Sequence, residues 1–166
     1  KPDSVDICFL PHGNYQKLVV EEMKGKPKTG NIVTEDGEVL GKHNGLFNYT
    51  IGQRKGLGIA YKHPLYVIGF NGDRNEVIVG PNERLFTNRM ICKFYNFLDD
   101  TIHKELKAEG KIRYAANPSP CTARILDDDT MEVIFEEPQR AITPGQSVAF
   151  YNGTQLLGGA VIDRVC

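Results

Sequence analysis

The alternation of apolar and polar residues changes its period within the first half of the chain. Between residues 12 and 23 apolar residues recur at spacings of three and four, which predicts a short amphipathic helix. Residues 31–34 and 38–40 then read as two strands joined by a tight turn at Asp36-Gly37. Residues 65–70 and 76–80 read as a second β-hairpin, rich in β-branched and aromatic side chains.

Short strands separated by turn signals fill the second half of the chain. Met131, Val133 and Phe135 alternate with Glu132, Ile134 and Glu136, so one face of that strand should lie in a core. Gly158-Gly159 indicates a bulge that helps to close a barrel. Regular spacing of this kind is typical of a small barrel or sandwich. The predicted strands are 90–98, 110–114, 121–126, 131–135, 147–151 and 156–162.

The pattern breaks at Pro81-Asn82-Glu83, and the segment that follows separates two groups of strands. We therefore expect a mainly β protein of two domains. The first, residues 1–85, is a small α+β domain, and the second, residues 86–166, is a β-barrel.

Composition is that of an ordinary folded protein, with 166 residues, 40% hydrophobic and 25% charged. The net charge of −1 lacks the basic excess of many nucleic-acid-binding proteins, so any RNA contact must be a local patch. Basic residues cluster at 24–28, at Arg54-Lys55 and at 111–113, and a solvated surface is the alternative for each. No apolar run is long enough for a membrane span, and we expect a cytoplasmic protein.

The four cysteines are far apart and form no C-x-x-C pair, which disfavours a zinc site and a disulfide framework. Burial is expected for Cys92 and Cys121, and mobility for Cys166 at the end of the chain. The Asp127-Asp128-Asp129 run is best explained as an exposed turn rather than a cation site.

Cys8 lies in a short apolar run that Pro11 ends, and it is the candidate centre of any covalent chemistry. A reactive thiolate needs a neighbouring cation, for which Lys1, His12 and His43 are candidates. The alternative is an inert, buried thiol.

Residues 41–58 are rich in glycine, amide and basic side chains, and they suit a loop that serves a ligand or a nucleic acid. They match neither the phosphate-binding P-loop nor the dinucleotide-binding fingerprint, and a merely structural loop is the alternative.

Four motifs occur in order: S-V-D-I-C-F at 4–9, Y-T-I-G-Q-R-K-G at 49–56, Arg113-Tyr114, and T-P-G-Q at 143–146. Together they resemble the tRNA-specific 2-thiouridylases over nearly the whole chain. The resemblance implies an enzyme that replaces the C2 oxygen of the wobble uridine of certain tRNAs with sulfur, using ATP to activate that oxygen.

In that family ATP is bound by a first domain with an S-G-G-x-D-S loop, and neither this loop nor that domain's catalytic cysteine occurs in this sequence. The chain therefore resembles the central and C-terminal portion, and alone it should not turn over. Cys8 takes the place of the cysteine that carries sulfur as a persulfide, received from a donor protein of a cysteine desulfurase relay. A neighbouring cysteine then releases the sulfur by forming a disulfide.

The resemblance also implies that the barrel is similar to the second domain of translation elongation factors and contacts tRNA through Arg113, Tyr114 and Gln146. Arginine can bind phosphate, tyrosine can stack on a base, and glutamine can bond a base edge. Two other hypotheses stay open: a non-catalytic RNA-binding β-barrel module, and an interaction domain in which Cys8 is simply buried.

Overall fold

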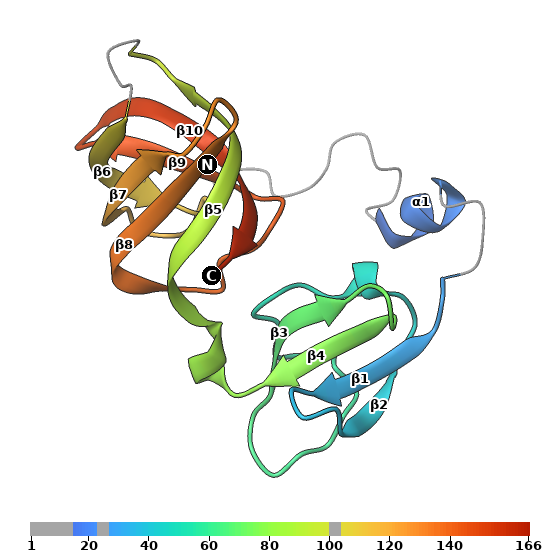
Figure 1. Cartoon of the computed structure of the whole chain (residues 1–166). Coiled ribbons are helices and arrows are strands. Elements are labelled where there is room, and N and C mark those ends of the chain that lie inside the picture. Colours follow the sequence, from blue (N-terminus) through green and yellow to red (C-terminus); the bar gives the residue numbers. More distant parts are fainter. Residues whose placement is uncertain (1–14, 23–26, 100–103) are drawn as a thin grey trace, which may run out of the picture. The chain divides into compact units, whose positions relative to one another are not determined.

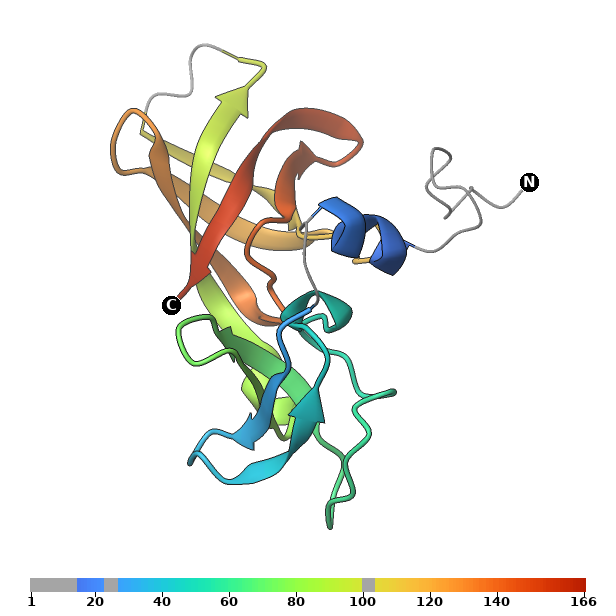
Figure 2. The same cartoon turned by 90° about the vertical axis from the view of Figure 1, so that its right-hand side faces the viewer.

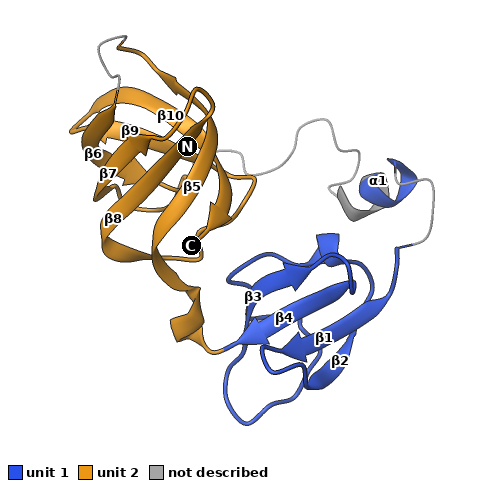
Figure 3. Cartoon of the chain, viewed as in Figure 1, with its two compact units in different colours: residues 1–80 blue, residues 81–166 orange. Residues whose placement is uncertain are grey.

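The computed structural model describes residues 15–22, 27–99 and 104–166, and it divides into two compact units, residues 1–80 and 81–166 (Figure 3). The predicted helix is confirmed as α1 (Tyr15–Glu22). Residues 81–85, which the sequence analysis grouped with the first domain, belong to the second unit. They include the short 3-10 helix η3 (Asn82–Leu85), and the Leu85 carbonyl accepts a hydrogen bond from Ala141 N at 2.7 Å.

The first unit contains a four-stranded sheet in the order β2-β1-β4-β3 (Figure 1). Both predicted hairpins are confirmed, β1 (Gly30–Thr34) with β2 (Val39–His43) and β3 (Tyr66–Asn71) with β4 (Glu76–Gly80). The two hairpins join through parallel pairing of β1 with β4, which local sequence patterns did not predict.

The core of this sheet takes residues from a loop as well as from strands. Ile32, Val67, Val77 and Val79 are fully buried in the sheet. Leu57 and Leu65 complete the cluster from the long connection between β2 and β3, which also holds the short 3-10 helix η2 (Leu46–Asn48). That connection extends away from the sheet in both views (Figures 1 and 2).

The second unit is a closed barrel in the strand order β10-β5-β8-β7-β6-β9, and every neighbouring pair is antiparallel (Figures 1 and 2). The mainly β fold class with a C-terminal barrel is thus confirmed. The strands are β5 (Phe86–Phe97), β6 (Glu105–Lys111), β7 (Ser119–Ile125), β8 (Thr130–Arg140), β9 (Ser147–Asn152) and β10 (Gln155–Val165).

The second of these strands begins and ends earlier in the chain than the sequence predicted. Residues 110–114 were expected to form it, but β6 ends at Lys111, and Ala116 N donates a hydrogen bond to Arg113 O in a tight turn. Arg113 and Tyr114 therefore lie in the β6–β7 connection rather than on a strand.

The barrel interior is filled by alternate strand residues, as predicted for Met131, Val133 and Phe135. Glu132 was expected on the solvent side, yet it is only 8% exposed. Arg89 of the adjacent strand β5 covers it, with Nε donating to Glu132 Oε1 at 2.6 Å. The predicted bulge is present, because the β9–β10 register shifts between Leu156 and Gly158, where Gly158 has φ 155°.

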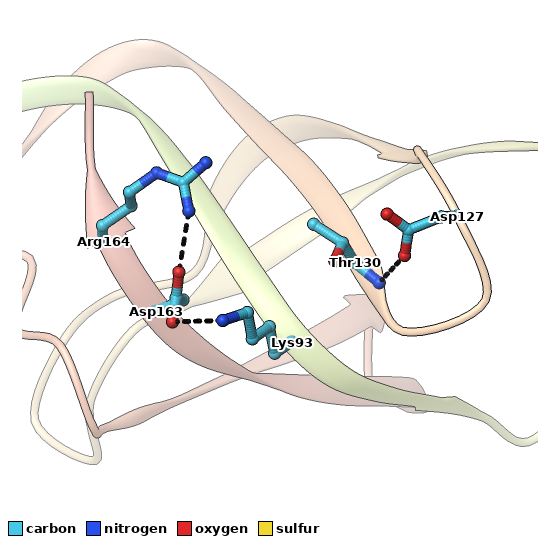
Figure 4. Close-up of polar contacts among 5 residues, drawn as sticks. All are labelled: Lys93, Asp127, Thr130, Asp163 and Arg164. Carbon is cyan, nitrogen blue, oxygen red and sulfur yellow. Dashed lines mark hydrogen bonds and ion pairs between the residues drawn. The ribbon is translucent and has the colours of Figure 1, made fainter.

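The three aspartates form the predicted exposed turn, between β7 and β8. Asp127 Oδ1 accepts hydrogen bonds from Asp129 N at 3.0 Å and Thr130 N at 2.7 Å (Figure 4). These bonds lower the pKa of the Asp127 carboxyl below its ordinary value. Its carboxylate therefore has a structural role in the turn.

Candidate nucleic-acid interface

Cys8, the candidate sulfur carrier, lies outside the described residues, as do Lys1 and His12. His43, the third proposed cation near Cys8, is described and is 1% exposed. Its Nδ1 accepts a hydrogen bond from Gly45 N at 3.0 Å, and its Nε2 lies 3.0 Å from Asn75 O. Both ring nitrogens are thus occupied inside the first unit, so His43 is a core residue rather than an exposed cation.

Two of the other cysteines are unreactive because they are buried. Cys92 and Cys121 are buried in the barrel core, as expected, and burial raises the pKa of each thiol to about 12. Cys166 is an exposed free thiol. Nucleophilic sulfur chemistry therefore has no support at Cys92 or Cys121.

Tyr114 is the most exposed of the large hydrophobic side chains in the described part of the chain, at 82%. Lys111 Nζ lies 5.6 Å from the centroid of its ring, within cation–π range. An open aromatic face beside a cation can stack on a nucleobase while the cation approaches a phosphate.

Arg113, next to it, is half-buried and already bonded. Its Nη2 donates to the carbonyl oxygens of Arg140 at 2.7 Å and Ala141 at 2.6 Å. The sequence predicts a phosphate-binding arginine on a strand and gives no sign of these two bonds, because the carbonyl partners lie 27 and 28 residues away in the chain. These hydrogen bonds attach the turn that contains Tyr114 to the end of strand β8.

Gln146 is exposed on the turn that leads into β9, and the backbone of that turn is held on both sides. Gly145 N donates to Ile162 O and Ile162 N donates to Gln146 O, both at 2.8 Å. Thr143 Oγ1 donates to Ala141 O at 3.0 Å, the same carbonyl that accepts from Arg113. The Arg113 turn and the Gln146 turn are therefore linked through the Ala141 carbonyl.

A hollow of about 340 Å³ lies beside the Arg113 turn. Residues of the β6–β7 connection and of the end of β8 line it, among them Arg113, Asn117, Gln139 and Arg140. Donor groups around an open hollow suit polar ligand atoms such as those of a nucleic acid.

The glycine-rich connection in the first unit uses backbone conformations that favour glycine. Gly45, Gly52, Gly56 and Gly58 all have positive φ, between 68° and 112°. The Gln53 side chain braces this segment, with Oε1 accepting from Thr50 N and Nε2 donating to Lys55 O, both at 3.0 Å.

Comparison with known proteins covers both units. The family model described as tRNA methyl transferase PRC-barrel domain matches residues 18–81, and that described as aminomethyltransferase beta-barrel domain matches residues 87–162. The tRNA-specific 2-thiouridylase MnmA of Clostridioides difficile is 44% identical over 165 residues, 99% of this chain and 46% of the relative. The chain belongs to the tRNA-specific 2-thiouridylase family.

Other thiouridylases align in the same way. The MnmA proteins of Carboxydothermus hydrogenoformans and Clostridium tetani are each 45% identical over 99% of this chain. The chain spans about half the length of these curated relatives, 45% and 46% respectively. Arg113, Tyr114 and Gln146 fall within the β-barrel match, and the glycine-rich connection falls within the PRC-barrel match.

The described residues lack both a membrane-spanning helix and a cluster of metal-binding side chains. They contain no helix long and apolar enough to cross a membrane. Over the same ranges, no group of three or more His, Cys, Asp and Glu side chains is arranged to hold a metal ion.

Proposed function

We propose that this chain is the part of a tRNA-uridine 2-sulfurtransferase that docks the tRNA and carries the sulfur. The observation that supports this most is identity of 44–45% to 2-thiouridylases along 99% of the chain. We expect the enzyme to act in the cytoplasm on the wobble uridine. The alternative of a non-catalytic RNA-binding module is not favoured by these relatives.

Docking rests on the linked turns of the barrel. Tyr114 offers an open ring for an unpaired base, Lys111 offers a charge for the adjacent phosphate, and the Gln146 amide can bond a base edge or ribose. Arg113 contacts tRNA through N–H groups other than its bonded Nη2 and also holds the Tyr114 turn in position.

Sulfur transfer rests on Cys8. Its thiolate attacks the outer sulfur of a persulfide on the donor protein, so that a new S–S bond forms and the donor leaves as a thiolate. The outer sulfur then bonds to C2 of the uridine, and the C2 oxygen leaves with the group that ATP would have attached to it. A second cysteine thiolate attacks Cys8 Sγ and breaks the bond between Sγ and the transferred sulfur, which stays on C2 as the thiocarbonyl. That attack forms a disulfide, which a cellular thiol reduces to begin another cycle.

The described residues, 15–22, 27–99 and 104–166, offer no P-loop-like site for ATP. The glycine-rich connection leads into β3 and not into a helix, so its backbone cannot cradle a triphosphate as a P-loop does. We assign ATP to a domain outside these 166 residues, where it would supply the activation of the uridine oxygen.

The test is an enzyme in which this chain is joined to such an ATP-binding domain, with tRNA 2-thiouridine measured by mass spectrometry. Cys8→Ser should abolish thiolation while tRNA affinity is kept, and the matched Cys166→Ser should stay active. Thiolation by the Cys8→Ser enzyme would show that another group carries the sulfur.

A further inference from the structure

The acidic residues of this chain are unevenly distributed. Residues 39–72 contain no aspartate or glutamate, so all 21 carboxylate residues lie in the other parts of the chain. The same stretch carries four cations, Lys42, Arg54, Lys55 and Lys62. A protein with a net charge of −1 thus concentrates local positive charge in one segment of its first unit.

The second half of this stretch encloses a hollow of about 490 Å³ within the first unit. Arg54, Lys62 and His63 contribute polar groups to its lining, and Tyr61 contributes an aromatic ring. Lys62 Nζ lies 5.9 Å from the centroid of that ring, and the His63 ring meets it edge-on at 4.9 Å between centroids. Tyr61 therefore presents a partly exposed ring beside the Lys62 ammonium.

The loop that forms the hollow, residues 54–65, is anchored at both ends. Val67 of the edge strand β3 accepts a hydrogen bond from Gly52 N at 2.8 Å and donates one to Gln53 O at 2.9 Å. Leu57 and Leu65 are buried in the core of the sheet. Such anchoring lowers the entropy that a charged loop loses when it binds a ligand.

We propose that residues 54–65 form a second tRNA-binding site, in addition to the linked turns of the barrel. Arg54 and Lys62 bind backbone phosphates, and Tyr61 stacks on an exposed base or packs on a ribose. This proposal rests on the proposed function, because it names a further surface for the same tRNA.

Two features favour RNA over an acidic protein as the partner. Gly58 has φ 68° and no atom within 4 Å of the position where a Cβ would stand, so a nucleic-acid backbone can approach the main chain there. The Tyr61 ring lies beside the Lys62 ammonium in a hollow that Arg54 also lines, as in sites that track a charged backbone while stacking on its bases.

The first test is binding of an unmodified tRNA transcript by the full chain over a range of salt concentrations. The double variant Arg54→Ala/Lys62→Ala should lower affinity on the order of tenfold and reduce the slope of log K against log salt by about two units. The control Arg74→Ala/Lys107→Ala removes equal charge from exposed positions elsewhere and should change neither quantity.

The second test is photo-crosslinking with benzoylphenylalanine placed at position 61 and, as a control, at position 70, another exposed aromatic in the first unit. A crosslink to tRNA from position 61 only is expected. An unchanged salt slope in the double variant, or no crosslink from position 61, would overturn the proposal. Loss of affinity for polyglutamate with tRNA binding unchanged would also overturn it and indicate an acidic protein partner.

These experiments distinguish failure of the second tRNA-binding site from failure of the proposed function. If Tyr114→Ala weakens tRNA binding but the Arg54/Lys62 variant does not, only the second site is wrong. If the chain binds no tRNA at all, both proposals are wrong.

Discussion

The barrel and the four-stranded sheet pair their strand edges in different ways. Six antiparallel strands of the second unit close on themselves, so each strand has a neighbour on both sides. The sheet of the first unit is open, and the outer edge of β3 is paired in part by Gly52 and Gln53 of the long connection. The connection between β2 and β3, which contains the loop of residues 54–65, is therefore also hydrogen-bonded to the sheet.

The two cores differ accordingly. The barrel core is built mostly from alternate strand residues, and two thiols are sealed within it. The core of the sheet takes Leu57 and Leu65 from the loop and buries the polar His43. In the first unit the loop therefore contributes side chains to the core. In the barrel, by contrast, the core is built mostly by strands, and the exposed turns lie outside it.

The largest expected effect concerns the sealed interior of the barrel. With pKa values near 12 instead of 9, Cys92 and Cys121 have about a thousandfold less thiolate near neutral pH, and burial also blocks access. Iodoacetamide should label Cys166 but neither Cys92 nor Cys121 in the native chain, and all four cysteines in denaturant. Labelling is measured by peptide mass spectrometry, and fast native labelling of Cys92 or Cys121 would contradict a closed barrel.

The next effect concerns the open sheet, where Gly30 of β1 permits the close approach of His43 in β2 and of the turn that ends at Asn75. A Cβ at this position would lie 1.9 Å from Asn75 O and 2.6 Å from His43 Nε2. Asn75 cannot easily move, because its side chain donates to Thr29 O at 2.9 Å. Gly30→Ala should lower the free energy of unfolding by on the order of 3 kcal/mol in a denaturant titration.

Gly69→Ala is the matched control, since Gly69 lies in β3 with no atom within 4 Å of its Cβ position. It should leave the free energy of unfolding nearly unchanged. Equal effects of the two variants would show that the packing of His43 against Asn75 does not limit the stability of the sheet.

Much of this comparison could be predicted from the sequence, because strand alternation and turn residues are local signals. Met131, Val133 and Phe135 indicated a core face, and Asp36-Gly37 indicated a hairpin turn, in which Gly37 has φ 86°. Burial of Glu132 could not be predicted, because its partner Arg89 is 43 residues away in the chain.

The candidate site was less predictable than the fold. Short motifs drew attention to Tyr114 and Gln146, but the link between their turns depends on the Ala141 carbonyl, a backbone group with no sequence signal. Likewise, the carboxylate-free stretch is visible in the sequence, whereas the anchoring of its loop to Val67 requires the three-dimensional structure.

The smallest expected effect comes from removing an ion pair on the outside of the barrel. The Asp163 carboxylate accepts from Lys93 Nζ at 3.0 Å and from Arg164 Nη1 at 2.9 Å (Figure 4). The hydrogen bond from Lys93 lowers the pKa of Asp163 below its ordinary value. A lowered folded-state pKa adds stability above the unfolded pKa, and this stability is lost as pH falls through the folded value.

Asp163→Asn should therefore unfold more easily than the parent near neutral pH, and the difference should shrink toward strongly acidic pH. Thermal unfolding at several pH values measures it. Asp73→Asn, in the exposed turn between β3 and β4, is the control that removes the same charge elsewhere. A pH-independent difference for Asp163→Asn would mean that the ion pair does not cause it.

The central claim is that the linked turns of the barrel dock tRNA, and equilibrium binding of a tRNA transcript to this chain tests it most directly. The account predicts that log K falls linearly with log salt for the parent, and that Tyr114→Ala/Gln146→Ala lowers affinity on the order of tenfold without changing thermal unfolding. The same affinity for the parent and this variant at every salt concentration would contradict it.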